Sequence, residues 1–204
     1  MSSDTQLFHQ VKDIDYLKCS RCKLVFVAPG QRLNPEEEKS RYDLHENDPE
    51  DPNYRKFLSQ LFDPLNKKLP PKSFGLDYGS GPGPTLHLMF EEAGHYMNIF
   101  DPFYDNDPVV LNNTYDFITT TETAEHFFEP GKEFNLLWTI LKKGGYLGVM
   151  TKLLKKPEHF ADWHYKEDDT HVAFYSEPTF QWIARHYGAD VEIFGERTII
   201  LKKH

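Results

Sequence analysis

A short apolar segment that ends in an acidic residue and runs straight into a glycine-rich turn constrains the fold of this chain more than any other feature. Residues 74–78 read Phe-Gly-Leu-Asp-Tyr, and the turn Gly79-Ser80-Gly81-Pro82-Gly83 follows at once. Glycine adopts positive φ angles without strain and carries no Cβ, so a ligand can closely approach the main-chain N–H groups of such a turn. The pattern predicts a strand, a ligand-binding turn and a helix in that order.

Strand-like and helix-like segments alternate after this turn. The predicted strands cover residues 74–78, 96–100, 115–120, 146–151, 191–194 and 197–201. The predicted helices cover residues 85–93, 131–141 and 177–187. This alternation is typical of an α/β fold with a doubly wound, Rossmann-like sheet that is mostly parallel. The last two strands predict a C-terminal antiparallel hairpin on that sheet.

The first part of the chain has a different character. We place a boundary at the proline pair Pro70-Pro71, which divides the chain into residues 1–70 and 71–204. The N-terminal unit is predicted to contain a hairpin with both cysteines, an acidic and proline-rich arm, and an amphipathic helix, over residues 16–27, 34–52 and 53–67. We expect this unit to cap the site formed by the second.

The overall charge argues against some classes of partner. The net charge is -9 and the pI is near 5.5, whereas proteins that grip nucleic-acid backbones present a basic face. No apolar run approaches the roughly 20 residues that span a bilayer, and residues 1–10 lack the apolar core of a signal peptide. Two cysteines are too few for a disulfide framework of the secreted kind. We therefore expect a cytoplasmic protein with a small-molecule partner, and the sequence leaves its oligomeric state open.

Three residues around the turn indicate which ligand it holds. Pro84 occupies the sixth position of the G-x-G-x-x-G pattern, where dinucleotide-binding turns need a small residue for close helix packing. Asp77 immediately precedes the turn, and its carboxylate suits a cationic ligand better than a pyrophosphate. Asp101 ends the next predicted strand, 22 residues after Gly79, where a carboxylate can accept both ribose hydroxyls of an adenosine. Together they favour a cationic adenosine cofactor.

Residues 72–204 resemble the class I S-adenosylmethionine-dependent methyltransferases. The likeness rests on Asp77, the glycine turn, Asp101, and two later segments, residues 115–126 and 141–147. The resemblance implies that S-adenosylmethionine is bound by Asp77, Tyr78, Gly79, Ser80, Gly81, Gly83, Asp101, Pro102, Phe103 and Thr121. Only 13 residues separate Asp101 from Tyr115, too few for the family's third strand and its flanking helices, so we expect that strand to be missing.

A second motif follows the predicted strand 115–120. Glu122, Glu125 and His126 form E-x-x-E-H, and helical spacing would place all three on one face. The motif resembles that of ubiquinone-pathway O-methyltransferases and small-RNA 2′-O-methyltransferases, which implies a divalent metal, Mg or Zn, beside the acceptor hydroxyl. The alternative is metal-free catalysis with His126 as the base. His171 would be a further metal ligand or a second base, so the predicted catalytic residues are His126, His171 and Glu122.

The acceptor is expected to contact two polar and aromatic segments. Residues 152–176 form a long irregular stretch after the strand 146–151, and such stretches commonly cover a site. This stretch contributes the candidates His164, Tyr165 and Tyr175. The N-terminal arm contributes Tyr42 and His45.

The two cysteines, Cys19 and Cys22, form one C-x-x-C pair. The chain resembles an uncharacterised bacterial branch of the methyltransferases that begins with a zinc ribbon of two such pairs. Zinc normally takes four ligands, so one pair predicts a weak zinc site or a metal-free remnant. The leading hypothesis is an enzyme that methylates a small molecule at oxygen. The alternatives are an RNA-modifying methyltransferase and a non-catalytic S-adenosylmethionine-binding module.

Overall fold

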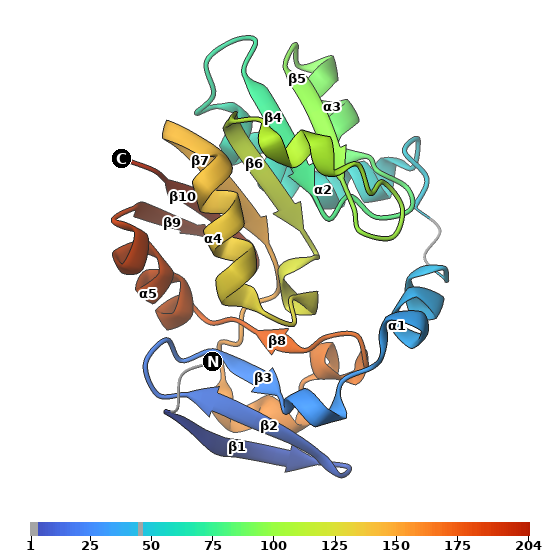
Figure 1. Cartoon of the computed structure of the whole chain (residues 1–204), viewed down its shortest axis with the longest axis vertical. Helices are drawn as coiled ribbons and strands as arrows, with labels where there is room; N and C mark the ends of the chain where they lie inside the picture. The colour runs from blue at the N-terminus through green and yellow to red at the C-terminus, as the bar shows by residue number, and fades with distance from the viewer. Residues whose placement is uncertain (1–3, 45–46) are drawn as a thin grey trace.

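A large mixed sheet forms the centre of the molecule (Figure 1). The computed structural model describes residues 4–44 and 47–204. The sheet has the strand order β5-β4-β6-β7-β10-β9. Its strands are β4 (Phe74–Tyr78), β5 (Tyr96–Phe100), β6 (Tyr115–Thr121), β7 (Leu141–Met150), β9 (Asp190–Phe194) and β10 (Thr198–Lys202). The first four are parallel and β10 runs antiparallel to both β7 and β9, which confirms the predicted α/β fold and the C-terminal hairpin.

The strand β5 forms one edge of this sheet. Between Asp101 and Tyr115 the described chain contains only the short 3-10 helix η2 (Pro108–Asn112) and a two-residue bridge that joins Asp101 to Asp105. No strand pairs with the outer side of β5 within the described ranges. The prediction that the third strand is missing is therefore confirmed.

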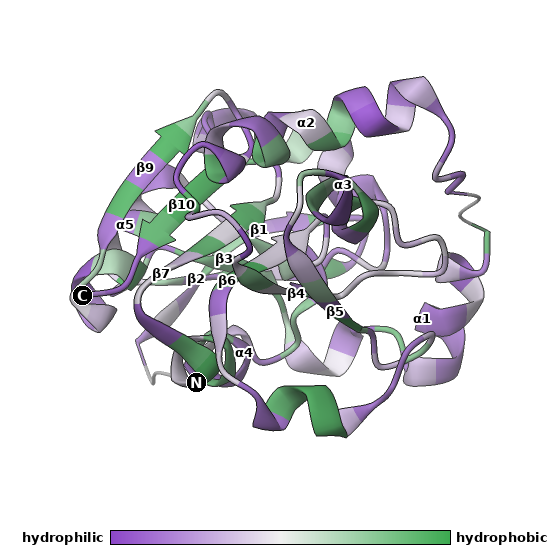
Figure 2. Ribbon diagram, turned by 90° about the horizontal axis from the view of Figure 1, so that it is seen from above, coloured by the Kyte–Doolittle hydropathy of each residue, from purple (hydrophilic) through white to green (hydrophobic). Residues whose placement is uncertain are grey.

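Helices cover both faces of the large sheet. The helices α2 (Pro52–Asn66) and α3 (Leu86–Glu92) share one core cluster with Phe117 of β6 and Ile200 of β10. The helices α4 (Pro130–Ile140) and α5 (Glu177–Tyr187) pack with the opposite face. The sequence sets the limits of α5, since Ser176 and Thr179 form a capping box and Gly188 ends the helix in the left-handed conformation. In Figure 2 the buried strand β10 is mostly hydrophobic, whereas the short helix α1 (Pro35–Tyr42) is mostly hydrophilic.

A second, smaller sheet lies beside the large one (Figure 1). Its strands, in order, are β1 (Thr5–Val11), β2 (Ile14–Cys19), β3 (Val25–Val27) and β8 (Ala173–Phe174). The predicted hairpin corresponds to β2 and β3, whereas β1 and α1 were not predicted. Because β8 belongs to the irregular stretch 152–176, its pairing with β3 fixes that stretch against the N-terminal strands. Phe160 and Phe174 of this stretch pack with Tyr16 of β2 in a shared hydrophobic core.

The remaining described elements are short 3-10 helices. They are η1 (Pro29–Gln31), η3 (Ala124–His126), η4 (Pro157–Asp162) and η5 (His164–Glu167). Within residues 4–44 and 47–204 we find no helix with both the length and the apolar character needed to cross a membrane.

Candidate functional site

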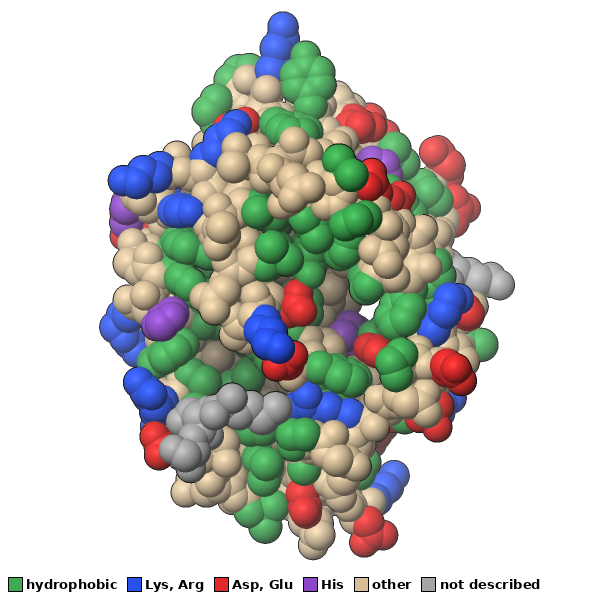
Figure 3. Space-filling model, in the orientation of Figure 1, with side chains coloured by type: hydrophobic (Ala, Val, Ile, Leu, Met, Phe, Trp, Pro, Cys, Tyr) green, Lys and Arg blue, Asp and Glu red, His purple; other side chains and the backbone are tan. Residues whose placement is uncertain are grey.

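The carboxyl ends of the parallel strands open into a cavity of about 570 Å³, which we call the acidic cavity. It lies between β4, β5 and β6 on one side and α1 with the segment after η5 on the other. Residues after β4, β5 and β6 line it, namely Gly79, Asp101 and Glu122. Figure 3 shows a hollow near the middle of this face, with acidic side chains and a histidine at its edge. This edge of a parallel sheet is where α/β proteins bind their ligands.

The glycine turn is held to the neighbouring strand by its own N–H groups. The N–H groups of Gly79 and Ser80 donate to the Phe100 carbonyl, at 2.8 and 3.3 Å, and that of Gly81 donates to the Asp101 carboxylate at 2.9 Å. The expectation that these N–H groups face a ligand is therefore wrong for all three. The turn shapes the cavity and fixes Asp101.

The three glycines of the turn serve different purposes. A Cβ on Gly79 would lie 2.1 Å from the Thr123 side chain, and one on Gly83 would lie 2.3 Å from the Asn47 carbonyl oxygen. Gly79 and Gly81 also have positive φ angles, of 78° and 70°. The space next to Gly81 is open, since no atom lies within 4 Å of a Cβ built there. Gly83 does not line the acidic cavity, whereas Gly79 and Gly81 do.

The two predicted cofactor carboxylates lie at different depths. Asp101 lines the cavity, and it also accepts from the N–H groups of Phe103 and Tyr104, at 2.9 and 3.1 Å. Asp77 is buried beneath the turn and accepts from the Thr119 hydroxyl at 2.7 Å. Burial raises the pKa of Asp77 to about 6, and the charge of Asp101 adds to the shift. Asp101 thus lies in the wall of the cavity, whereas Asp77 lies beneath the turn and does not line the cavity.

The residues between the turn and β6 fit a nucleoside-bearing cofactor. Tyr78, Pro102 and Phe103 give the cavity apolar and aromatic walls. The hydroxyl groups of Ser80 and Thr121 are buried at its surface without a hydrogen-bond partner among the described residues. Buried polar groups are rarely left unpaired, so these hydroxyls are suited to bond a polar ligand. The chain's own residues therefore suit the cofactor that the fold implies.

Glu122 does not share a helical face with Glu125 and His126. Its φ angle is 48°, so the backbone turns there, and the 3-10 helix η3 begins only at Ala124. Its carboxylate pairs with Arg197 at 3.2 Å. Burial raises the pKa of Glu122 to about 8, and Glu125 adds to the shift while Arg197 opposes it. The prediction of one shared face fails because a left-handed residue interrupts the helical spacing.

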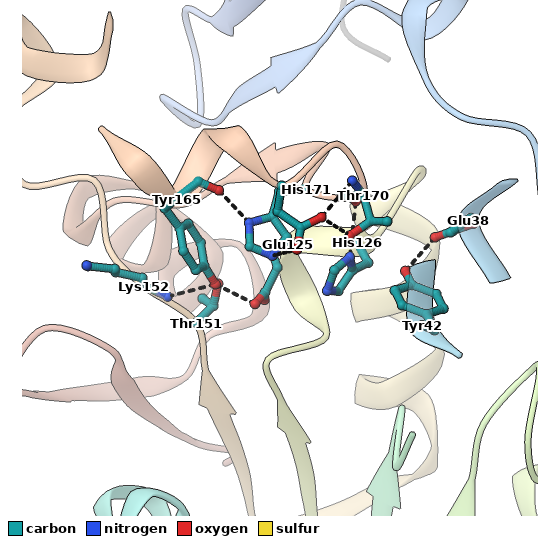
Figure 4. Close-up of polar contacts among 10 residues, drawn as sticks. Glu38, Tyr42, Glu125, His126, Thr151, Lys152, Tyr165, Thr170 and His171 are labelled. Atoms are coloured by element: carbon teal, nitrogen blue, oxygen red, sulfur yellow. Dashed lines mark hydrogen bonds and ion pairs between the residues drawn. The ribbon is translucent and has the colours of Figure 1, made fainter. Parts of the chain in front are cut away.

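Glu125, His126 and His171 come together at the far end of the cavity (Figure 4). One ligand atom from each lies within 4.8 Å of the others, and the two imidazole centroids are 4.9 Å apart. Glu125 accepts a hydrogen bond from the Tyr165 hydroxyl through one oxygen, and its other oxygen is buried without a partner among the described residues. The long loop and the motif after β6 thus meet, although Thr170 lies 44 positions after His126 in the sequence.

Hydrogen bonds fix the tautomer of both histidines. His126 Nδ1 lies 3.1 Å from the Thr170 carbonyl, and His171 Nδ1 lies 2.6 Å from the Tyr165 carbonyl. A carbonyl oxygen only accepts, so each Nδ1 carries a proton, and the neutral form of each ring has its lone pair on Nε2. Burial lowers the pKa of His126, which keeps it neutral near pH 7. Each imidazole is thus able to accept a proton or to bind a metal through Nε2.

The predicted acceptor residues are dispersed. Tyr42 lines the cavity, where its hydroxyl donates to Glu38 at 2.6 Å and its ring packs edge-on against His126. Tyr165 lies behind Glu125 and does not line the cavity. His164 is exposed and contacts Lys152 at 3.1 Å, away from the site. His45 falls outside the described residues.

Three other predicted residues line a second cavity of about 520 Å³, which we call the apolar cavity. It lies between the small sheet and the helices α4 and α5, and Cys19, Cys22 and Tyr175 are part of its wall. The Tyr175 hydroxyl donates to the Ala124 carbonyl at 3.0 Å, so this side chain is structural. Both cysteines are unbridged, and burial raises the pKa of Cys22 to about 11. Within the described ranges, neither cysteine belongs to a group of three or more potential metal ligands.

Two cavity residues had no recognisable signal in the sequence. Glu38 belongs to an acidic run in α1, where only the fold distinguishes it from its exposed neighbours Glu36 and Glu37. Glu133 is on α4 and accepts from the Tyr78 hydroxyl at 2.5 Å. Both carboxylates add to the negative lining of the acidic cavity.

Comparisons with known proteins agree with this geometry. Residues 51–192 match the family described as Methyltransferase domain. Magnesium protoporphyrin IX methyltransferase from Synechocystis PCC 6803, solved with bound S-adenosylhomocysteine, is similar with a TM-score of 0.54 and 13% identity, over 83% of this chain and 94% of that one. An O-methyltransferase family protein from Burkholderia thailandensis is similar with a TM-score of 0.54 and 15% identity, over 82% of this chain and 62% of that one. At these identities the likeness shows the fold.

No curated protein matches the chain in sequence. The family match covers most of the chain, and it spans the glycine turn, Asp101 and the motif after β6. The chain therefore belongs to the Methyltransferase domain family, and it shares its fold with S-adenosylmethionine-dependent methyltransferases.

Proposed function

We propose that this enzyme methylates a small molecule at a hydroxyl oxygen, with His126 or His171 as the base. The supporting observation is the pair of imidazoles at the end of the acidic cavity, each with a free Nε2. The carboxylates that line the cavity would repel the phosphates of a nucleic acid, which favours a small acceptor over RNA.

The cofactor would lie along the glycine turn. Asp101 would bind the ribose hydroxyls, Ser80 and Thr121 would bond its polar groups, and Pro102 and Phe103 would pack against its base. When bound, S-adenosylmethionine supplies an electrophilic methyl group on a sulfonium. Asp77 lies below the turn, where its negative charge favours a cationic ligand above it.

The catalytic contribution of the chain would be alignment and proton removal. Nε2 of His126 or His171 would accept the proton of the acceptor hydroxyl, and that oxygen would take the methyl group that bound S-adenosylmethionine would supply. Glu125 sits beside both imidazoles and stabilises the positive charge that the base acquires. Tyr42 closes the opposite wall by its edge-on contact with His126.

Glu125, His126 and His171 also have the composition of a divalent-cation site, and a metal such as Mg or Zn would orient the acceptor oxygen there. Glu122 is directed to Arg197, so it would not be the fourth ligand in this arrangement. We favour the metal-free mechanism because the group contains a single carboxylate among the described residues, whereas a hard cation such as Mg prefers oxygen ligands. Elemental analysis of the purified protein tests this: less than about 0.1 equivalent of bound metal per chain supports it.

The small sheet, α1 and the stretch after β7 would cover the acceptor. We propose that the Cys19–Cys22 pair is a metal-free remnant, since no third ligand lies near it in the described ranges. The same elemental analysis, applied to the parent protein and to a variant with both cysteines replaced, tests this proposal. If the parent binds one equivalent of zinc and the variant keeps it, the zinc is bound elsewhere.

The binding of S-adenosylhomocysteine to the full chain, followed by calorimetry, is the decisive first test. We expect one site per chain. Methyl transfer from labelled S-adenosylmethionine to a panel of hydroxylated small molecules then tests catalysis. No binding would refute the proposed function, and binding without transfer to any acceptor would leave the non-catalytic alternative as the better account.

A further inference from the structure

The acidic cavity contains a large excess of negative charge. Among the described residues neither lysine nor arginine lines it, and its ionisable side chains besides two histidines and four tyrosines are all carboxylates. These six are Glu38, Asp101, Glu122, Glu125, Glu133 and Asp168. Like charges gathered in a cavity repel one another, so a ligand that brings positive charge is favoured there.

Most of these carboxylates are compensated only by neutral donors. Asp101 receives three backbone N–H groups at the cofactor end, and Asp168 receives the backbone N–H and hydroxyl of Thr170. Glu38 and Glu133 each receive one tyrosine hydroxyl. Among the described residues only Glu122 pairs with an arginine or lysine, Arg197, while Asp168 also lies 3.8 Å from Nε2 of His171. The end of the cavity near His126 therefore holds Glu38, Glu125 and Asp168 without a lysine or arginine partner there.

Glu125 provides an independent indication of a missing partner. Its side chain is fully buried, with 0% exposed, and it lines the cavity. One carboxylate oxygen accepts from Tyr165, while the other has no hydrogen-bond partner among the described residues. A buried carboxylate oxygen left unpaired is costly, more so than a neutral group. A donor on the bound acceptor would remove that cost.

Aromatic rings complete the walls around these carboxylates. Tyr42 lies with its ring centroid 5.2 Å from that of His126 and 5.7 Å from that of Phe103. Phe57 and Phe128 line the same space. The faces of aromatic rings attract alkylammonium groups, and a carboxylate beside them adds a charge-assisted hydrogen bond. Carboxylates with aromatic walls thus form a site suited to an organic cation.

From this combination we infer that the acceptor is a small organic cation, with a protonated amine held by Glu125 and the neighbouring carboxylates. The inference rests on the proposed function, which it narrows from hydroxylated small molecules to amine-bearing ones. The ammonium donates to the free oxygen of Glu125, and the acceptor's hydroxyl lies by the imidazoles. An acidic or neutral metabolite of the same size would bind more weakly.

Three probes that share a phenol and differ in charge test the inference. Tyramine is positive, 4-hydroxyphenethyl alcohol is neutral and 4-hydroxyphenylacetate is negative. Each is titrated by calorimetry into the full chain saturated with S-adenosylhomocysteine, after EDTA treatment. We expect tyramine to bind at least about tenfold more tightly than the alcohol, and the acid most weakly, because a charge-assisted hydrogen bond is worth about that factor.

Variants assign the preference to the cavity. Glu125→Gln should reduce the tyramine preference about tenfold and leave the affinity for the alcohol unchanged. Glu38→Gln, which keeps an acceptor for Tyr42, should reduce it less and guards against a folding defect at Glu125. Glu158→Gln removes an exposed carboxylate that does not line this cavity, and it should change nothing.

The outcomes separate this inference from the proposed function. If S-adenosylhomocysteine binds but the three probes bind equally, or none binds, or the acid binds best, the cationic acceptor is refuted while the methyltransferase site stands. If added Mg²⁺ or Zn²⁺ strengthens the binding of all three probes alike, the cation of this cavity is a metal and the inference fails. Methylation of tyramine at nitrogen would retain the cationic acceptor and correct the acceptor atom.

Discussion

The acidic and apolar cavities have similar volumes, about 570 and 520 Å³, and differ in their chemistry. Phe127 and Phe128 line both, so the two spaces are neighbours. The acidic cavity is bordered by buried, unpartnered oxygens of Ser80, Thr121 and Glu125. None of the unpartnered buried atoms of the described residues lies on the apolar cavity. Unsatisfied polar groups, and not size, therefore distinguish the proposed site.

The difference follows from where each cavity lies in the fold. The acidic cavity opens at the carboxyl ends of parallel strands, where each strand stops and its following residues point into one space. The apolar cavity lies where α4 and α5 meet the small sheet, and it is walled by side chains such as Phe26, Phe134 and Trp182. Those side chains are part of the packing that joins the two sheets.

The largest expected difference between the cavities is in catalysis. His126→Asn and His171→Asn should each lower kcat about 100- to 10,000-fold if that histidine is the base, because a general base typically contributes that much. The binding of S-adenosylhomocysteine should stay within a few-fold of the parent value. Methyl transfer at saturating cofactor, with calorimetry alongside, measures both quantities.

His186→Asn is the matched control, since His186 lines the apolar cavity. It should leave kcat unchanged. A loss of activity in this variant equal to that in the two others would erase the functional distinction between the cavities.

Stability should respond differently to alanine at one glycine of each cavity. Gly79→Ala forces a Cβ to within 2.1 Å of Thr123 at a positive φ angle, and it should lower the free energy of unfolding by about 2–4 kcal/mol. Gly131, at the N-terminal end of α4, has open space around it, so Gly131→Ala should be neutral or stabilising by up to about 1 kcal/mol. Urea titration of both variants compares them, and equal losses would contradict the packing role of Gly79.

The sequence was sufficient to predict those helices and strands whose limits are determined by local residue pattern. The segments that became β4, β5 and α5 were predicted at their observed limits, because their apolar spacing and end residues agree with the fold. The strand β1 was missed because its residues alternate weakly and most are exposed. The pairing of β3 with β8 joins residues about 150 positions apart, which no local pattern encodes.

The candidate site was likewise predictable only for residues whose type and order in the sequence indicate their chemistry. The glycine turn, Asp101 and the two histidines carry their chemistry in the residue type and order, and the structure brings them to one cavity. Glu122 departs from expectation because spacing assumes a continuous helix, and its φ angle of 48° breaks it. The roles of Glu38 and Tyr175 depend on tertiary packing, which places Glu38 in the wall of the acidic cavity and Tyr175 in the wall of the apolar cavity.

The pH dependence of stability should arise on the acidic side. The pKa of Asp77 is raised from 3.8 to about 6 by burial, so between these values the folded state holds a proton that the unfolded state has lost. The free energy of unfolding should therefore fall as pH rises from about 4 to 6, by up to about 3 kcal/mol. Glu122, whose pKa is raised to about 8, adds a fall of the same sign, so Asp77→Asn should remove only the part of the slope that Asp77 contributes, while keeping an acceptor for Thr119.

The apolar cavity offers the comparison for this titration. The pKa of Cys22 is raised to about 11, so its thiol stays protonated in both folded and unfolded states up to about pH 7. Cys22→Ser should therefore leave the shape of the stability profile between pH 4 and 7 unchanged. Thermal unfolding across that range measures all three proteins, and an unaltered slope in Asp77→Asn would assign the dependence to other groups.

The smallest expected difference concerns cofactor affinity. Asp101→Asn keeps an oxygen that can accept from the backbone N–H groups but removes the negative charge, so S-adenosylhomocysteine should bind about 10- to 100-fold more weakly. Glu129→Gln removes a carboxylate from the rim of the apolar cavity and should leave the affinity unchanged. Calorimetry measures the affinity of each variant, and near-ultraviolet circular dichroism shows whether the glycine turn and its surroundings keep the parent structure. An affinity equal to the parent's in Asp101→Asn would mean that the cofactor does not use this carboxylate, and the acidic cavity would then need another explanation for the negative charge at the end of β5.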